Sequence, residues 1–87
     1  MHVRIISPEA SVYDGEADSV VLPAFDGEVG ILPRHAPLMT LLGHGRLTVR
    51  VEGAERIFDV QGGFVQVVND TVSVVAEHAK TRAKEAK

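Results

Sequence analysis

Apolar and polar residues alternate along residues 46–52, which puts Leu47, Val49 and Val51 on one face of an extended chain. Successive side chains of a β-strand point to opposite faces, so a period of two is the spacing expected of a strand. The segment therefore predicts a strand with one face buried and the other in solvent.

Similar short segments recur, separated by turn-forming residues. Residues 52–55 and 69–70 carry turn chemistry, and Gln61-Gly62-Gly63 interrupts the run between them. The expected strands are residues 3–7, 11–13, 17–22, 46–52, 56–60, 64–68 and 71–76. Seven to ten short strands with frequent turns predict an all-β fold, an antiparallel sandwich or a barrel.

The pattern changes only at the C-terminal end. Residues 77–87 are mostly Ala, Lys, Glu and Arg, with no Gly or Pro, and so predict a short helical stub. The chain is therefore divided into a β-domain at residues 1–76 and a charged helical tail at residues 77–87. The domain is acidic, whereas the tail holds all the lysines but no aromatic residue, which favours a solvated segment over a nucleic-acid contact.

Length and composition bound the class of protein. A chain of 87 residues forms one small domain, marginally stable alone, and we expect a partner to stabilise it. It has no cysteine for disulfides, no apolar run of the roughly 18 residues that span a bilayer, and Pro8 interrupts any signal-peptide core. We therefore expect a globular domain that stays on the side of the membrane where it is made.

Catalytic motifs are missing from the sequence. No lysine precedes residue 80, which excludes a Walker phosphate loop, and Gly43-His44-Gly45 lacks the third glycine of a dinucleotide fingerprint. No serine lies in a Gly-x-Ser-x-Gly elbow. The sequence therefore predicts a protein that is not an enzyme and carries no cofactor.

Metal-ligating residues are equally sparse. Asp26 and Glu28 flank a glycine, but two carboxylates are too few for calcium, and a solvated β-turn is the favoured interpretation. His35 lies in a proline-bounded loop, where we expect a structural hydrogen bond to nearby backbone. The histidines are scattered, so no metal site is predicted, although a β fold could gather two of them: His2, His35, His44 and His78.

Five segments, in their order and spacing, resemble the epsilon subunit of F-type ATP synthase. The resemblance extends to about Glu77 and corresponds to the N-terminal domain of that family. Its most specific part is residues 27–38, where glycines are followed by a Pro-x-His-Ala-Pro loop. The segments are residues 7–9 (SPE), 13–17 (YDGEA), 21–23 (VLP), 26–38 (DGEVGILPRHAPL) and 61–67 (QGGFVQV).

The resemblance implies a fold and a function. The fold is a flattened β-sandwich of about ten strands. The function is that of a non-catalytic rotor subunit in the central stalk of a proton-translocating synthase, joining the gamma subunit to the membrane c-ring. Its expected location is the cytoplasmic face of a bacterial inner membrane, as a peripheral subunit without direct membrane insertion. By position, the implied c-ring contacts are Asp26, Gly27, Glu28, Arg34 and His35, and the implied gamma contacts are Ser7 and Thr40.

The chain departs from that family in two ways. Many members have glycine where this chain has Arg34, so a positive φ there would be strained. Members commonly continue into a two-helix C-terminal domain that inhibits hydrolysis, whereas this sequence ends at Lys87. We therefore expect a short form that lacks the inhibitory domain.

A freestanding β-sandwich that binds a ligand is the alternative function. Such a module would need exposed aromatic side chains. The chain has four aromatic residues, and we expect all of them to serve the core: Tyr13, Phe25, Phe58 and Phe64.

Overall fold

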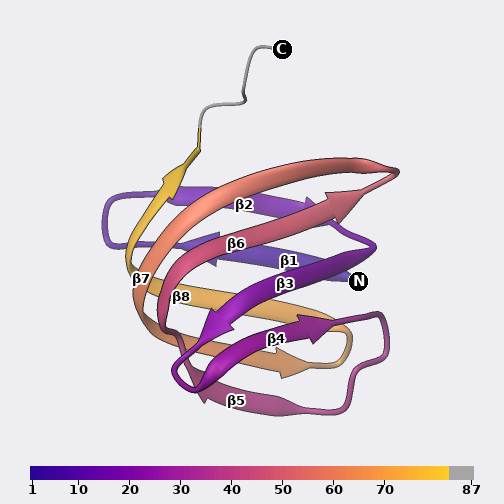
Figure 1. Cartoon of the computed structure of the whole chain (residues 1–87). Helices are drawn as coiled ribbons and strands as arrows, with labels where there is room; N and C mark the ends of the chain where they lie inside the picture. The colour runs from indigo at the N-terminus through magenta and orange to yellow at the C-terminus, as the bar shows by residue number, and fades with distance from the viewer. Residues whose placement is uncertain (83–87) are drawn as a thin grey trace.

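The computed structural model describes residues 1–82, which form eight β-strands (Figure 1). Within these residues every regular element is a strand, so the predicted all-β class is confirmed, with eight strands where about ten were expected. The strands are β1 (His2–Ile6), β2 (Ser11–Glu16), β3 (Ser19–Ala24), β4 (Gly27–Ile31), β5 (Leu38–Leu41), β6 (His44–Val51), β7 (Ala54–Val68) and β8 (Thr71–Thr81).

The strands form one sheet folded into two layers. Their order is β2-β1-β8-β7-β6-β3-β4. Strand β5 pairs with residues 64–67 of β7, beyond the part of β7 that pairs with β6. All pairs are antiparallel except β1 with β8, which is parallel. The first layer contains β3, β4, β6 and residues 54–61 of β7. The second layer contains β1, β2, β5 and residues 64–68 of β7, so that β7 and β8 belong to both layers.

The bend between the layers lies at Gly62 and Gly63. Their φ angles are +70° and +107°, and a Cβ on Gly63 would overlap the carbonyl oxygen of Val75. The buried positions of β7 are even-numbered before the bend and odd-numbered after it. The expectation of two separate strands at residues 56–60 and 64–68 is therefore wrong, because the two glycines bend one long strand. Without a side chain, glycine can adopt a positive φ, and its backbone can lie close to the backbone of β8.

The core fills the space between the two layers. Phe58 is fully buried, and its ring meets the ring of Tyr13 edge to face, with the centroids 5.8 Å apart. The other buried members are almost all aliphatic, as expected for side chains that alternate inward from facing sheets: Val3, Ile5, Ala17, Val20, Leu22, Ile31, Leu42, Leu47, Val49, Val60, Val65, Val67, Val72, Val74 and Ala76.

The C-terminal stub is a strand as far as the structure describes it. Because β8 runs to Thr81, the helix predicted from residue 77 is wrong for residues 77–81, and the predicted boundary at residue 76 falls inside an element. Ala79 packs against the core, and the backbone N–H of Arg82 donates to the carbonyl oxygen of Ile57 at 2.9 Å. Pairing with β7 outweighs the weak local preference for helix. Residues 83–87 of the predicted tail lie outside the described residues.

Candidate interaction surfaces

Four apolar residues form a row across the outer surface of the second layer. Leu41 on β5 pairs with Phe64 on β7, Phe64 pairs with Val75 on β8, and Val75 pairs with Ile6 on β1. Residues that are paired across strands point to the same face of a sheet. The Leu41 side chain is 59% exposed and that of Phe64 is 40% exposed, so this row faces solvent.

The row belongs to a wider apolar face, formed by Ile6, Met39, Leu41, Phe64, Val68 and Val75. Met39 is 63% exposed on the same side of β5 as Leu41. Ile6, Phe64 and Val75 also line a groove of about 430 Å³ together with Pro8. Large apolar side chains gathered on one outer face are a feature of surfaces that contact other macromolecules.

The aromatic residues divide between the core and the surface. Phe58 lies in the core and Tyr13 packs partly against it, as expected. Phe64 lies on the apolar face, and Phe25, at the turn between β3 and β4, is 66% exposed. The expectation that all four aromatic residues serve the core is therefore wrong for Phe25 and Phe64, because the first lies at a turn and the second follows the bend that reverses the faces of β7.

The two residues expected near gamma lie at the margin of the apolar face. Ser7 lines the groove beside Ile6, and its hydroxyl donates to the Glu9 carboxylate at 3.2 Å. Thr40 lies between Met39 and Leu41 on β5 but is half-buried, on the opposite side of the strand from both. The sequence interpretation missed the apolar face itself. Consecutive apolar residues at 64–65 and at 67–68 make both faces of one strand apolar, and this pattern could have indicated the face.

The five residues expected at the c-ring occupy two ends of β4. Asp26, Gly27 and Glu28 are exposed at the turn where β4 begins, and Arg34 and His35 follow its other end in the β4–β5 loop, residues 32–37 (Figure 1). Because β4 is an edge strand of the sheet, both groups lie along one margin of the molecule. The structure therefore does not gather them into one cluster.

The β4–β5 loop has a defined local geometry. Arg34 has φ of +66°, the conformation in which we expected strain, and its backbone N–H donates to Asp70 Oδ1 at 2.8 Å. The backbone N–H of His35 donates to the Leu32 carbonyl oxygen at 3.2 Å. His35 Nδ1 lies 2.6 Å from the Ala36 carbonyl oxygen, so the expected structural hydrogen bond of this imidazole is present.

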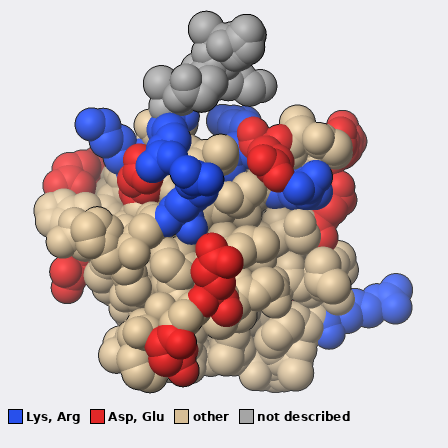
Figure 2. All heavy atoms as spheres, in the orientation of Figure 1, with Lys and Arg blue, Asp and Glu red and all other residues tan. Residues whose placement is uncertain are grey.

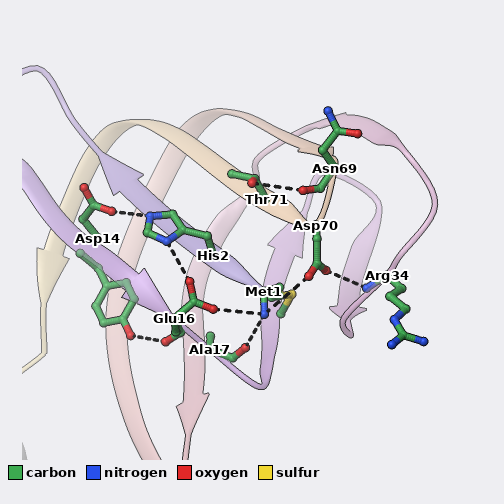
Figure 3. A network of polar contacts seen from close by, with 10 residues as sticks. Met1, His2, Asp14, Glu16, Ala17, Arg34, Asn69, Asp70 and Thr71 are labelled. Atoms are coloured by element: carbon green, nitrogen blue, oxygen red, sulfur yellow. Dashed lines mark hydrogen bonds and ion pairs between the residues drawn. The ribbon is translucent and has the colours of Figure 1, made fainter.

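A polar network lies beside Asp70 at the start of β1 (Figure 3). The imidazole of His2 contacts Asp14 Oδ1 through Nε2 at 2.5 Å and Glu16 Oε2 through Nδ1 at 3.2 Å. The hydrogen bond to Asp14 is the largest cause, and that to Glu16 the next, of a pKa of His2 raised above its usual 6.5. The backbone N–H of His2 donates to the Asp70 carbonyl oxygen at 3.0 Å.

The outer surface of the first layer is polar. His44, Gln61 and His78 form one row across β6, β7 and β8, and Arg46, Asp59 and Lys80 form the next. All of them except Arg46 line a second groove, of about 470 Å³.

Figure 2 shows most Lys and Arg side chains on the upper half of the view and a broad, largely uncharged area below. Among residues 1–82, no three His, Asp or Glu side chains are arranged to hold a metal ion.

The described part of the chain contains no helix long and apolar enough to cross a membrane.

Comparison with known proteins gives consistent matches. Residues 1–82 match the family described as ATP synthase, Delta/Epsilon chain, beta-sandwich domain. The ATP synthase epsilon chain of Caulobacter vibrioides is 39% identical over 79 residues, which is 91% of this chain and 92% of that relative. The epsilon chain of Leptospira borgpetersenii is 45% identical over 78 residues, and there the chain spans 61% of the relative's length.

Two solved structures share the fold. A chain of the Euglena gracilis mitochondrial ATP synthase OSCP/F1/c-ring assembly has a TM-score of 0.84 at 22% identity, covering 91% of this chain and 51% of that one. A chain of the Tetrahymena thermophila mitochondrial ATP synthase central stalk and c-ring has a TM-score of 0.74 at 20% identity, covering 91% and 64%.

Proposed function

The chain belongs to the ATP synthase delta/epsilon β-sandwich family, and we propose that it joins the gamma subunit to the c-ring in the central stalk of a proton-translocating synthase. Its relatives are named epsilon chain, the non-catalytic subunit of the complex. The solved structures of similar fold come from assemblies that contain a c-ring, and one of these assemblies is a central stalk with its c-ring. In this proposal the chain is a peripheral part of the synthase at the cytoplasmic face of a bacterial inner membrane.

The apolar face is the surface that we propose for gamma. Burying a fully exposed Leu, Phe or Met side chain contributes roughly 1.5–3 kcal/mol, so Met39, Leu41 and Phe64 together offer several kcal/mol to a partner. The flanking Ser7 would then lie at the polar rim of the interface, and Thr40, on the inner side of β5, would lie at its margin. The exposed apolar row is the single observation that carries the proposal.

The edge along β4 is the surface that we propose for the c-ring. Asp26 and Glu28 are exposed acids at one end of the strand, and Arg34 is an exposed cation at the other end, next to the half-exposed imidazole of His35. Contacts at both ends of a strand would resist tilting better than a single cluster would. Complementary charges on the polar loops of a ring would set the orientation of such a contact.

The architecture suits mechanical coupling because the domain is a closely packed body with two separate surfaces. A core packed as densely as an organic crystal deforms little under load. No chemistry of its own is required of such a part, since it transmits rotation through its shape.

Binding to gamma tests the proposal. Leu41→Asp puts a charge into the apolar row at an exposed position and should weaken binding to purified gamma subunit about thirtyfold or more, as expected for an interface hot spot. Ala54→Asp adds the same charge at the exposed start of β7, in the first layer and away from both grooves, and should leave gamma binding unchanged. Equal binding by wild type and Leu41→Asp, with both folded by circular dichroism, would contradict the assignment of this face.

A further inference from the structure

We propose that Asp70 is a positioning residue that holds the β4–β5 loop in the shape it needs to meet the c-ring, an inference that rests on the proposed function. The loop contains Arg34 and His35 and joins an edge strand to β5. Asp70 lies outside the loop, in the turn between β7 and β8, and so acts on the contact through Arg34.

Asp70 joins three parts of the chain. Its Oδ1 accepts the backbone N–H of Arg34 at 2.8 Å, and its carbonyl oxygen accepts the backbone N–H of His2 at 3.0 Å. Its Oδ2 lies 3.8 Å from the Met1 amino group (Figure 3). The β4–β5 loop is thereby attached to the start of β1 and to the β7–β8 turn, although it is far from both in the sequence.

The loop depends on this attachment because Arg34 has an unfavourable backbone conformation. A non-glycine residue at φ of +66° persists only where surrounding contacts over-determine it. Within the loop, the backbone bond from His35 to Leu32 is long at 3.2 Å, whereas the Asp70 bond is shorter and has a carboxylate acceptor. Charge-assisted hydrogen bonds are the stronger class, so the carboxylate of Asp70 is the main contact that fixes Arg34.

The same turn touches the apolar face. Val68, a member of that face, ends β7 two residues before Asp70, and Thr71 begins β8 directly after it. Asp70 itself is not a member of that face, and its contacts go to Arg34, His2 and Met1, so its substitution should leave the surface proposed for gamma intact.

A second carboxylate provides a matched control. Asp18 Oδ2 accepts the backbone N–H of Glu52 at 2.8 Å, and Glu52 has φ of +50°. The chemistry is that of the Asp70–Arg34 pair, but it fixes the β6–β7 turn instead. Asp18→Gly should therefore loosen that turn and leave the β4–β5 loop unaffected.

The experiment compares Asp70→Gly, Asp70→Asn and Asp18→Gly in the full chain. Glycine tolerates the φ of +61° at residue 70, so the first change removes the carboxylate without adding backbone strain. Two quantities are measured: hydrogen exchange of the Arg34 amide in the free chain, and binding to gamma alone and to the gamma–c-ring assembly.

Asp70→Gly should speed exchange of the Arg34 amide about tenfold and weaken binding to the gamma–c-ring assembly about tenfold, with binding to gamma alone unchanged. Asp70→Asn keeps an acceptor oxygen and should recover part of both losses, whereas Asp18→Gly should match wild type in both. Unchanged Arg34 exchange in Asp70→Gly, or an equal loss in Asp18→Gly, would overturn the inference. Failure of the wild-type chain to bind the ring would instead overturn the proposed function, and the exchange rates would still decide whether Asp70 holds the loop.

Discussion

Replacing Gly63 by alanine tests whether the bend in β7 is set by backbone contact. The added Cβ would overlap the Val75 carbonyl oxygen and lie 2.9 Å from Ala76 Cα, both in the backbone of the paired strand β8. Neither atom can move away without separating the two strands. In addition, φ of +107° is a conformation that residues with a Cβ avoid.

The expected cost follows from these two effects. A positive φ costs an L-residue about 1–2 kcal/mol, and forcing an atom into a packed region costs about 1–3 kcal/mol more. Gly63→Ala should therefore lower the free energy of unfolding by about 2–5 kcal/mol. The free energy of unfolding of small proteins is about 0.05–0.15 kcal/mol per residue, which gives roughly 4–13 kcal/mol for a chain of this size. The variant would therefore lose a large share of its stability.

Urea unfolding followed by circular dichroism measures the effect, with Gly53→Ala as the control. Gly53 has φ of +83° but no atom within 4 Å of its added Cβ, so its substitution carries only the backbone cost of about 1–2 kcal/mol. A Gly63→Ala variant no less stable than Gly53→Ala would refute the argument that contact with β8 fixes the bend.

Three further changes test other parts of the structure. Because the pKa of His2 is raised, its ion pairs stabilise the fold fully below pH 6.5, and this stabilisation is lost as the pH rises through the pKa of the folded state. Asp14→Asn should therefore move the pKa of His2, measured by NMR titration, back toward 6.5. An unchanged titration curve would show that other groups cause the shift. Arg34→Gly should raise stability by about 0.5–1 kcal/mol in thermal unfolding, since the relief of the positive φ exceeds the entropy cost of glycine, and a lower midpoint would show that Arg34 is not strained. Phe58→Ala should cost about 3–5 kcal/mol in urea unfolding because the ring is fully buried, whereas a loss below 1 kcal/mol would place the centre of the core elsewhere.

The sequence predicts the strands well where one face alone is apolar. Leu47 and Val49 alternate with polar residues, and the structure buries both of them in β6. At residues 77–81 the sequence predicts a helix, because Ala, Lys and Glu favour helix locally. The structure forms a strand there because these residues pair with β7, and a local pattern does not contain that interaction. The sequence correctly predicts an interruption at Gly62 and Gly63, but whether glycine ends a strand or bends it depends on the neighbouring strand.

The candidate surfaces are harder to predict because they arise from long-range pairing. Leu41, Phe64 and Val75 lie far apart in the sequence, and only the register of three strands puts them in one row. Within its own segment Phe64 has the pattern of a core residue, because that segment does not show that the buried and exposed faces of β7 exchange at the glycine bend. The resemblance to a family indicated Ser7 and Thr40, which border the apolar face, but gave no sign of its exposed centre.

The hairpin of β7 and β8 gives the sandwich a property that two separate sheets would lack. Since both strands continue from one layer into the other, the layers are joined by covalent backbone as well as by packed side chains. Sliding one layer over the other would require rupture of the ladder at the glycine bend. Because melting of either layer would expose the apolar side of the other, we expect the domain to unfold in a single cooperative step and to twist as one piece when torque is applied at its margin.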